Sequence, residues 1–514
     1  MTPLRSIFAV LLAVHFAAPI QAEPAPDSPR PPVSRETTFF TEPLLDDGRV
    51  DYIAAINTHR GLPIPPEQNA AIPLLLLVPA DHFGPGFQAI AKAMQLTPEP
   101  GRLTLASFPT DEDGYRVSAV GRAIRRPWNR ADSPATAQWL AENTATLDIV
   151  VQAADRPRFT VPLVRTADTR QLIQVLRPHL VFARRAADGL MVRANLALSE
   201  GRIDDALRDA HAIRRLGKHL TEDPTFIGTM IGLGVQEQSM RTTLRILSHP
   251  ETTAAQARQI LRTTADQLDH TLLANPAHLH ERCVVLDFLQ TQPFTSTTDL
   301  SRPDPKLAAA DPHFDIQEVR TQINARFDRL APILKRPKMA DRIAAMAEDL
   351  ARAKRHAQES SSSESTASQL AHFTVHDLVT EGLAWLRHPY TTTRDIQLAA
   401  LHDLVHLAAA LRLYRFEHGR FPQSLAELVP RYIADLPTDR YDGRPLTYRP
   451  NHAGSAYTLY AVGNDGHDNG GKTYFLTRDP DNFDIAVSHP FPLIEVVHIP
   501  SPIPTEFPQT FPAE

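Results

Sequence analysis

Apolar residues return every three or four positions through the middle of the chain. That spacing places them on one face of an α-helix. Between residues 171 and 357 it predicts an all-helical domain, either a bundle or a short solenoid. The expected helices cover 172–200 (with a kink or a later start at Pro178), 202–220, 225–247, 254–269, 278–292, 315–334 and 337–356.

The region before this domain, 46–170, has a weaker and more mixed pattern. Its clearest helix is expected at 135–154, where apolar residues again recur at helical spacing. We interpret Trp128 and Trp139 as core residues. The dense apolar run at 70–80 contains two prolines and is expected to be a short buried helix or strand.

A different pattern follows a serine-rich stretch at 358–371, which is too polar to bury a core and is expected to be a linker. A long helix is predicted at 391–418, ended by Gly419. Short strands with turn residues come next. The fold class is therefore mainly α with a C-terminal α+β module at 372–489, in which a long helix precedes a small antiparallel sheet. The expected strands are 446–449, 456–462, 474–477, 484–487 and 494–499.

The N-terminus carries an export pattern. Arg5 precedes an apolar run, Ile7–Ala18, and a small residue, Ala22, follows. The run has about 12 residues, whereas a membrane-spanning helix needs roughly 20. Residues 1–22 are thus predicted to be a signal peptide cut after Ala22, which implies a periplasmic or secreted protein. An uncleaved N-terminal anchor is the alternative, and no integral membrane segment is expected in the mature chain.

Composition narrows the classes of partner. The formal net charge is −6 with both signs well mixed, which argues against a nucleic-acid partner. Cys283 is the one cysteine, so the chain cannot form an intramolecular disulfide, and we expect it to be a small buried residue. Proline is abundant in a leader at 23–45 and a tail at 490–514, and we expect these proline-rich ends to be extended.

Three blocks of sequence in the C-terminal module share an order and spacing with a known family. The first is LAAALRLYRFEHGRFPQSLAELV, the second LPTDRYDGRPLTYR, and the third YTLYAVGNDGHDNGG followed by Asp484-Ile485. This segment resembles the globular domain of the major pseudopilins of type II secretion. It departs from them in lying at the C-terminal end of a long chain and in having Arg440 where the family has a proline.

The third block also suggests a metal site. Residues 463–471 combine oxygen-bearing side chains with glycines, which allow tight turns. Calcium binds six to eight oxygen ligands of this kind. In the family that the segment resembles, this loop binds calcium, and the matching positions here are Asp465 and Asp484. Loop chemistry adds Asp468. A turn held by side-chain hydrogen bonds without metal is the alternative.

Histidine pairs offer a second chemistry. His402 and His406 are four residues apart on the predicted long helix with Asp403 between them, a spacing that can hold zinc in a hydrolase. The stretch His278 to Glu281 is a weaker metal candidate. The acidic residues Asp204, Asp205 and Asp209 are interpreted as a solvated helix face.

The interpretation favoured by the sequence is an exported, non-enzymatic interaction protein. A helical scaffold would bind an unidentified protein partner, and the pseudopilin-like module would be stabilised by calcium. Two alternatives stay open. One is the zinc-dependent hydrolase using His402 and His406. The other is a helical-repeat scaffold, suggested by the stretch LALSEGRIDDALRDAHAI, which resembles one tetratricopeptide-type hairpin turning at Gly201.

Overall fold

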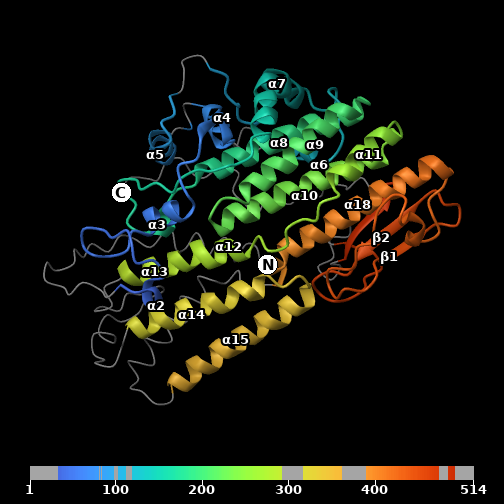
Figure 1. The fold of residues 1–514 in the computed structure, drawn as a ribbon. Coiled ribbons are helices and arrows are strands. Elements are labelled where there is room, and N and C mark those ends of the chain that lie inside the picture. The colour runs from blue at the N-terminus through green and yellow to red at the C-terminus, as the bar shows by residue number, and fades with distance from the viewer. Residues whose placement is uncertain are drawn as a thin grey trace.

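A computed structural model describes residues 33–79, 82, 84–97, 102–110, 118–291, 316–361, 389–473 and 484–491. It is mainly helical, with a small three-stranded antiparallel sheet near the C-terminus (Figure 1). The predicted fold class is confirmed. The predicted signal peptide, the expected strands at 474–477 and 494–499 and the tail beyond 491 lie outside the described residues, as does most of the serine-rich linker.

The N-terminal region consists of short helices packed beside one long one. Helix α7 begins with Pro134 at its first turn, where proline's missing N–H costs nothing, and runs 21 residues. Trp128 and Trp139 are both buried, as predicted. The apolar run at 70–80 contains a short helix, α4. The helices of this region are α2 (Arg35–Thr38), α3 (Tyr52–His59), α4 (Ala71–Leu76), α5 (Pro85–Ala93), α6 (Ser118–Arg125) and α7 (Pro134–Ala154).

The leader expected at 23–45 is packed where it is described. Helix α2 is capped by the Ser34 side chain. The side chain of Asn324 donates hydrogen bonds to the carbonyl oxygens of Arg35 and Glu36, at 2.7 and 3.0 Å. The ring of Phe39 lies 4.3 Å from the buried guanidinium of Arg282. Residues 34–40 therefore form part of the helical body.

Four helices follow along the chain: α8 (Pro178–Ser199), α9 (Ile203–Leu220), α10 (Phe226–Ser248) and α11 (Ala254–Thr263). Helix α8 starts at Pro178, the later of the two starts expected. Gly201 turns the chain into α9 with a φ of +70°, a left-handed conformation that favours glycine. Helix α11 ends six residues before the predicted boundary, at Thr263.

Helices α9 and α10 approach each other closely at Gly217 and Gly232. A Cβ atom added to Gly232 would lie 2.6 Å from the carbonyl oxygen of Gly217 and 2.7 Å from the backbone nitrogen of Thr221. Only glycine fits at this crossing, because backbone atoms occupy the space that a side chain needs.

A second layer of helices follows: α12 (Ala274–Pro276), α13 (Arg282–Thr291), α14 (Ile316–Leu334) and α15 (Met339–Ser361). The expected helix at 278–292 begins with a π-helical turn, Ala277–Glu281. Helix α15 extends into the first residues of the expected linker. Helices α14 and α15 run side by side at one edge of the molecule (Figure 1).

The C-terminal module contains the short helix α17 (Pro389–Thr392), the long helix α18 (Arg394–His418) and the sheet. Gly419 ends α18 in the left-handed conformation, as predicted. The strands β1 (Thr447–Pro450), β2 (Tyr457–Ala461) and β3 (Ile485–His489) are antiparallel in the order β1-β2-β3. Ala461 pairs with Ile485, so both ends of the connection between β2 and β3 meet at one edge.

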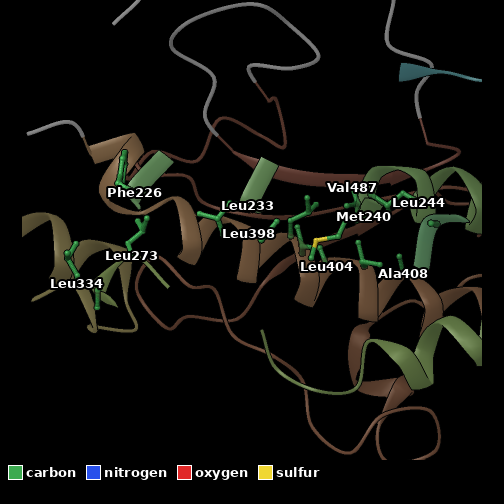
Figure 2. Packing of buried hydrophobic residues seen from close by; sticks show 14 of the residues in the cluster. Phe226, Leu233, Met240, Leu244, Leu273, Leu334, Leu398, Leu404, Ala408 and Val487 are labelled. Carbon is green, nitrogen blue, oxygen red and sulfur yellow. The ribbon is translucent and has the colours of Figure 1, made fainter. Parts of the chain in front are cut away.

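Helix α18 packs against α10 and α11 of the helical domain. Figure 2 shows Leu233 and Met240 of α10 beside Leu398 and Leu404 of α18, with Val487 of β3 nearby. These residues belong to one continuous hydrophobic core, which runs from α3 to the sheet. A second core lies among α4 to α10. Helix α18 is therefore docked on the helical domain.

Among the described residues, α18 is the one helix with the length and hydropathy of a membrane span. In the structure 94 % of its apolar window is buried within the protein. A helix that is apolar on nearly all sides is expected wherever it is surrounded by other elements.

One expectation about the helical domain was wrong. Asp209 is not on a solvated face: its side chain is fully buried and accepts two hydrogen bonds from the guanidinium of Arg193, at 2.8 and 2.9 Å. A third Arg193 nitrogen donates to Asp148 of α7 at 2.7 Å. The pair joins three helices, because a buried carboxylate requires a matched donor.

Candidate functional site

The candidate metal loop connects β2 to β3. Asp484 directly precedes β3, and Asp465 and Asp468 lie in the turn-rich stretch after β2. Gly466, Gly470 and Gly471 all have positive φ values, between +73° and +81°. These positive φ values form the tight turns that the glycine-rich sequence indicated.

Asp484 is the most unusual of the three carboxylates. It is 3 % exposed, and its Oδ2 accepts a hydrogen bond from the Gly471 backbone nitrogen at 2.8 Å. Its Oδ1 is buried and has no hydrogen-bond partner among the described residues. Burial, with a smaller contribution from the charges of Asp468 and Asp465, raises the pKa of Asp484 to about 6, although the hydrogen bonds from Gly471 and Asn469 act to lower it. An unpartnered buried oxygen beside two like charges requires a cation or a proton.

Asp465 and Asp468 are more exposed to solvent than Asp484, and one carboxylate oxygen of each already accepts a backbone hydrogen bond. Asp465 Oδ1 accepts from the His467 backbone nitrogen at 3.2 Å, and Asp468 Oδ1 from the Gly470 backbone nitrogen at 2.8 Å. Both are turns closed by a side-chain carboxylate. Within the described parts of the chain, no group of three acidic, histidine or cysteine side chains is close enough to hold a metal ion. The structure therefore brings the three aspartates into one neighbourhood without forming a finished side-chain cage.

The histidine pair has a different environment. His402 is buried, and burial lowers its pKa to about 4, assisted by Arg214, His406 and Arg440. His406 Nδ1 lies 3.0 Å from the Thr264 hydroxyl. Asp403, the carboxylate that the hydrolase hypothesis needs between the histidines, accepts from Arg440 Nε at 2.7 Å. These contacts join α18 to its neighbours, and they pair the Asp403 carboxylate with the Arg440 guanidinium.

The weaker histidine candidates are also engaged locally. His278 Nδ1 is 3.1 Å from an Arg282 nitrogen, and His280 Nδ1 is 3.0 Å from the Glu281 carboxylate. Cys283 is fully buried, as expected, and burial raises its pKa well above the usual thiol range. A protonated, inaccessible thiol is a poor nucleophile.

Two residues near the loop received no role from the sequence. Asp439 is buried, and its two carboxylate oxygens accept from the backbone nitrogens of Tyr441 and Val462, at 2.7 and 2.8 Å. Tyr441 places its hydroxyl directly over Gly466. Both belong to the second block of the pseudopilin-like pattern, which was the signal available for finding them.

Comparison of the chain with protein-family models, with curated proteins and with solved structures gave no match.

Proposed function

We propose that this chain is an exported, non-enzymatic interaction protein whose pseudopilin-like C-terminal module is stabilised by calcium and docked on a helical scaffold. The observation that carries the proposal is Asp484. Its buried Oδ1 has no hydrogen-bond partner in the part of the chain that the structure describes, and the carboxylates of Asp465 and Asp468 lie nearby. Calcium also accepts backbone carbonyls and water as ligands, so the site does not require three side chains alone.

The expected behaviour follows from charge. Without a cation, the carboxylates repel each other. With calcium the charges are neutralised and the loop becomes ordered against the sheet edge. Because the metal binds the folded state, it stabilises that state by mass action, by about 2.7 kcal/mol when free calcium is roughly a hundred times its dissociation constant.

The variant Asp484→Asn removes the negative charge at this position and keeps the size and shape of the side chain, so it shows how the charge alone affects stability. Near neutral pH and with a chelator present, we expect this variant to melt at a higher temperature than the wild type. The folded carboxyl has a pKa of about 6, above its ordinary value, so its ionised form costs the folded state stability. Asparagine removes that charge and keeps an oxygen for Gly471. The measurement is thermal unfolding of the full mature chain by circular dichroism.

With calcium in place of the chelator, the wild type should melt at a higher temperature than Asp484→Asn. We expect calcium to raise the melting temperature of the wild type by a few degrees and to leave that of Asp484→Asn and Asp465→Ala unchanged. Asp269→Ala is the matched control, because Asp269 closes a similar exposed turn by accepting from the Thr271 backbone nitrogen at 2.7 Å, far from the loop in the sequence. A calcium shift that persists in Asp484→Asn would refute the site.

The hydrophobic core that the helical domain shares with the C-terminal module limits how the helical-repeat scaffold alternative can be tested. If the two parts were independent, a chain lacking 372–514 would show whether the helical scaffold alone binds the partner. In the structure this deletion also exposes apolar residues of α10, including Leu233 and Met240. Single substitutions in the loop are therefore the cleaner test, and they leave this core intact.

A further inference from the structure

The turn at 439–444 contacts three separate parts of the protein. On one side it holds the start of the metal loop, because the Val462 backbone nitrogen donates to Asp439 Oδ2 at 2.8 Å. The Asp439 carbonyl oxygen also accepts from the Gly443 backbone nitrogen at 2.8 Å, which closes the turn on itself. The geometry of this turn is therefore tied to where the loop leaves the sheet.

Tyr441 makes the second contact with the loop. A Cβ atom added to Gly466 would overlap the Tyr441 hydroxyl. Gly466 follows Asp465 directly, so the tyrosine ring lies against the backbone beside a candidate metal ligand. Any change in that backbone has to displace the ring or be resisted by it.

The other side of the turn caps helix α15. The backbone nitrogen of Met339 donates to the Arg440 carbonyl oxygen at 2.9 Å, and that of Ala340 to the Tyr441 carbonyl oxygen at 3.1 Å. The first N–H groups of a helix have no partner within it, so these two carbonyls satisfy donors that would otherwise be orphaned. Lys338 packs its side chain over Gly443.

Arg440 fixes the turn to the third element. Its Nε and one terminal nitrogen donate to the two oxygens of Asp403 on α18, at 2.7 and 3.3 Å. The Asp403 side chain is largely buried, which makes a two-pronged guanidinium contact strong. With α18 as a fixed support, the turn can pass a displacement of the loop on to α15.

We infer that the 439–444 turn transmits the state of the 463–471 loop to the first turn of helix α15. The inference rests on the proposed function for what sets that state, namely calcium. In the metal-bound protein the loop backbone holds Tyr441, and the Arg440 and Tyr441 carbonyls hold the α15 N-terminus. Helix α15 lies at the edge of the molecule, where a partner could detect this change (Figure 1).

A pair of glycine substitutions in the full chain tests the transmission without metal. Gly466→Ala and Gly470→Ala introduce the same left-handed strain, since the φ values are +75° and +73°. Only the first meets Tyr441. At Gly470 the nearest atom, on the Arg449 side chain, is 3.9 Å away. We expect Gly466→Ala to speed amide exchange of Met339 and Ala340 by about tenfold, measured by mass spectrometry, with no change in Gly470→Ala.

The inference would be overturned if the two substitutions changed the amide exchange of Met339 and Ala340 equally, or if neither changed it. Adding calcium to the wild type gives the second arm. Slower exchange at Met339 and Ala340 together with a higher melting temperature supports transmission of the metal state. A higher melting temperature with unchanged exchange overturns the inference and leaves the calcium site standing. No thermal shift removes the calcium site, while the glycine pair still decides whether the turn transmits.

Discussion

Replacing Arg342 by alanine should destabilise the folded protein by about 3–5 kcal/mol. Arg342 on α15 is fully buried, and its guanidinium donates to Asp395 of α18 at 2.6 Å. It also donates to the carbonyl oxygens of Thr392, His270 and Arg336. Removing it leaves a buried carboxylate and several carbonyls without donors.

The matched control is Arg352→Ala on the same helix. Arg352 is exposed and lies 3.5 Å from Glu348 in a surface pair, which contributes about 0–1 kcal/mol. Urea unfolding of both variants measures the difference. Similar midpoints for the two variants would contradict the role assigned to Arg342. The double variant Arg342→Met with Asp395→Leu should recover part of the loss, since it removes both charges.

The cost of Arg342→Ala should also depend on pH. Burial raises the pKa of Asp395 to about 6 even with the guanidinium beside it. Without Arg342 this pKa rises further, so the folded variant binds a proton that the unfolded chain releases at lower pH. The variant's deficit should therefore be largest near neutral pH and shrink as the pH falls toward 5. A deficit independent of pH would show that lost packing, and not the unpaired charge, dominates.

Gly232→Ala should have the second large effect, a loss of about 1–3 kcal/mol or more. The added methyl group would lie within 2.7 Å of backbone atoms of Gly217 and Thr221, and backbone cannot move aside as a flexible side chain can. Helices α9 and α10 would have to separate. That separation opens contacts between two helices that both hydrophobic cores share.

Gly234→Ala is the control, two residues further along α10. Apart from the adjoining backbone of α10 itself, no atom of the described residues lies within 4 Å of the position that its Cβ would occupy. Alanine costs less backbone entropy than glycine in a helix, so we expect this variant to gain about 0.5–1 kcal/mol. Opposite signs for the two variants in chemical unfolding would confirm the close crossing. A gain in both would show that the helices tolerate a wider separation.

The candidate site was only partly predictable from sequence. The glycine-rich spacing of 463–471 indicated a tight loop, and the family resemblance named Asp465 and Asp484. The unpartnered oxygen of Asp484 was not predictable, because it depends on how the strand pair β2–β3 and the loop enclose that side chain. Arg440, which replaces a proline of the resembled family, contacts Asp403 only because the 439–444 turn packs against α18 within the folded module.

What the sequence determined by itself is the local structure. Pro178 and Gly419 mark the start of α8 and the end of α18, because proline suits a helix's first turn and glycine the left-handed residue after its last. The tertiary structure alone decided which charges are buried and what α18 contacts. In the sequence, Asp209 and Asp395 are indistinguishable from ordinary polar positions of an amphipathic helix pattern. Their partners, Arg193 and Arg342, lie on other helices, and no local signal encodes that pairing.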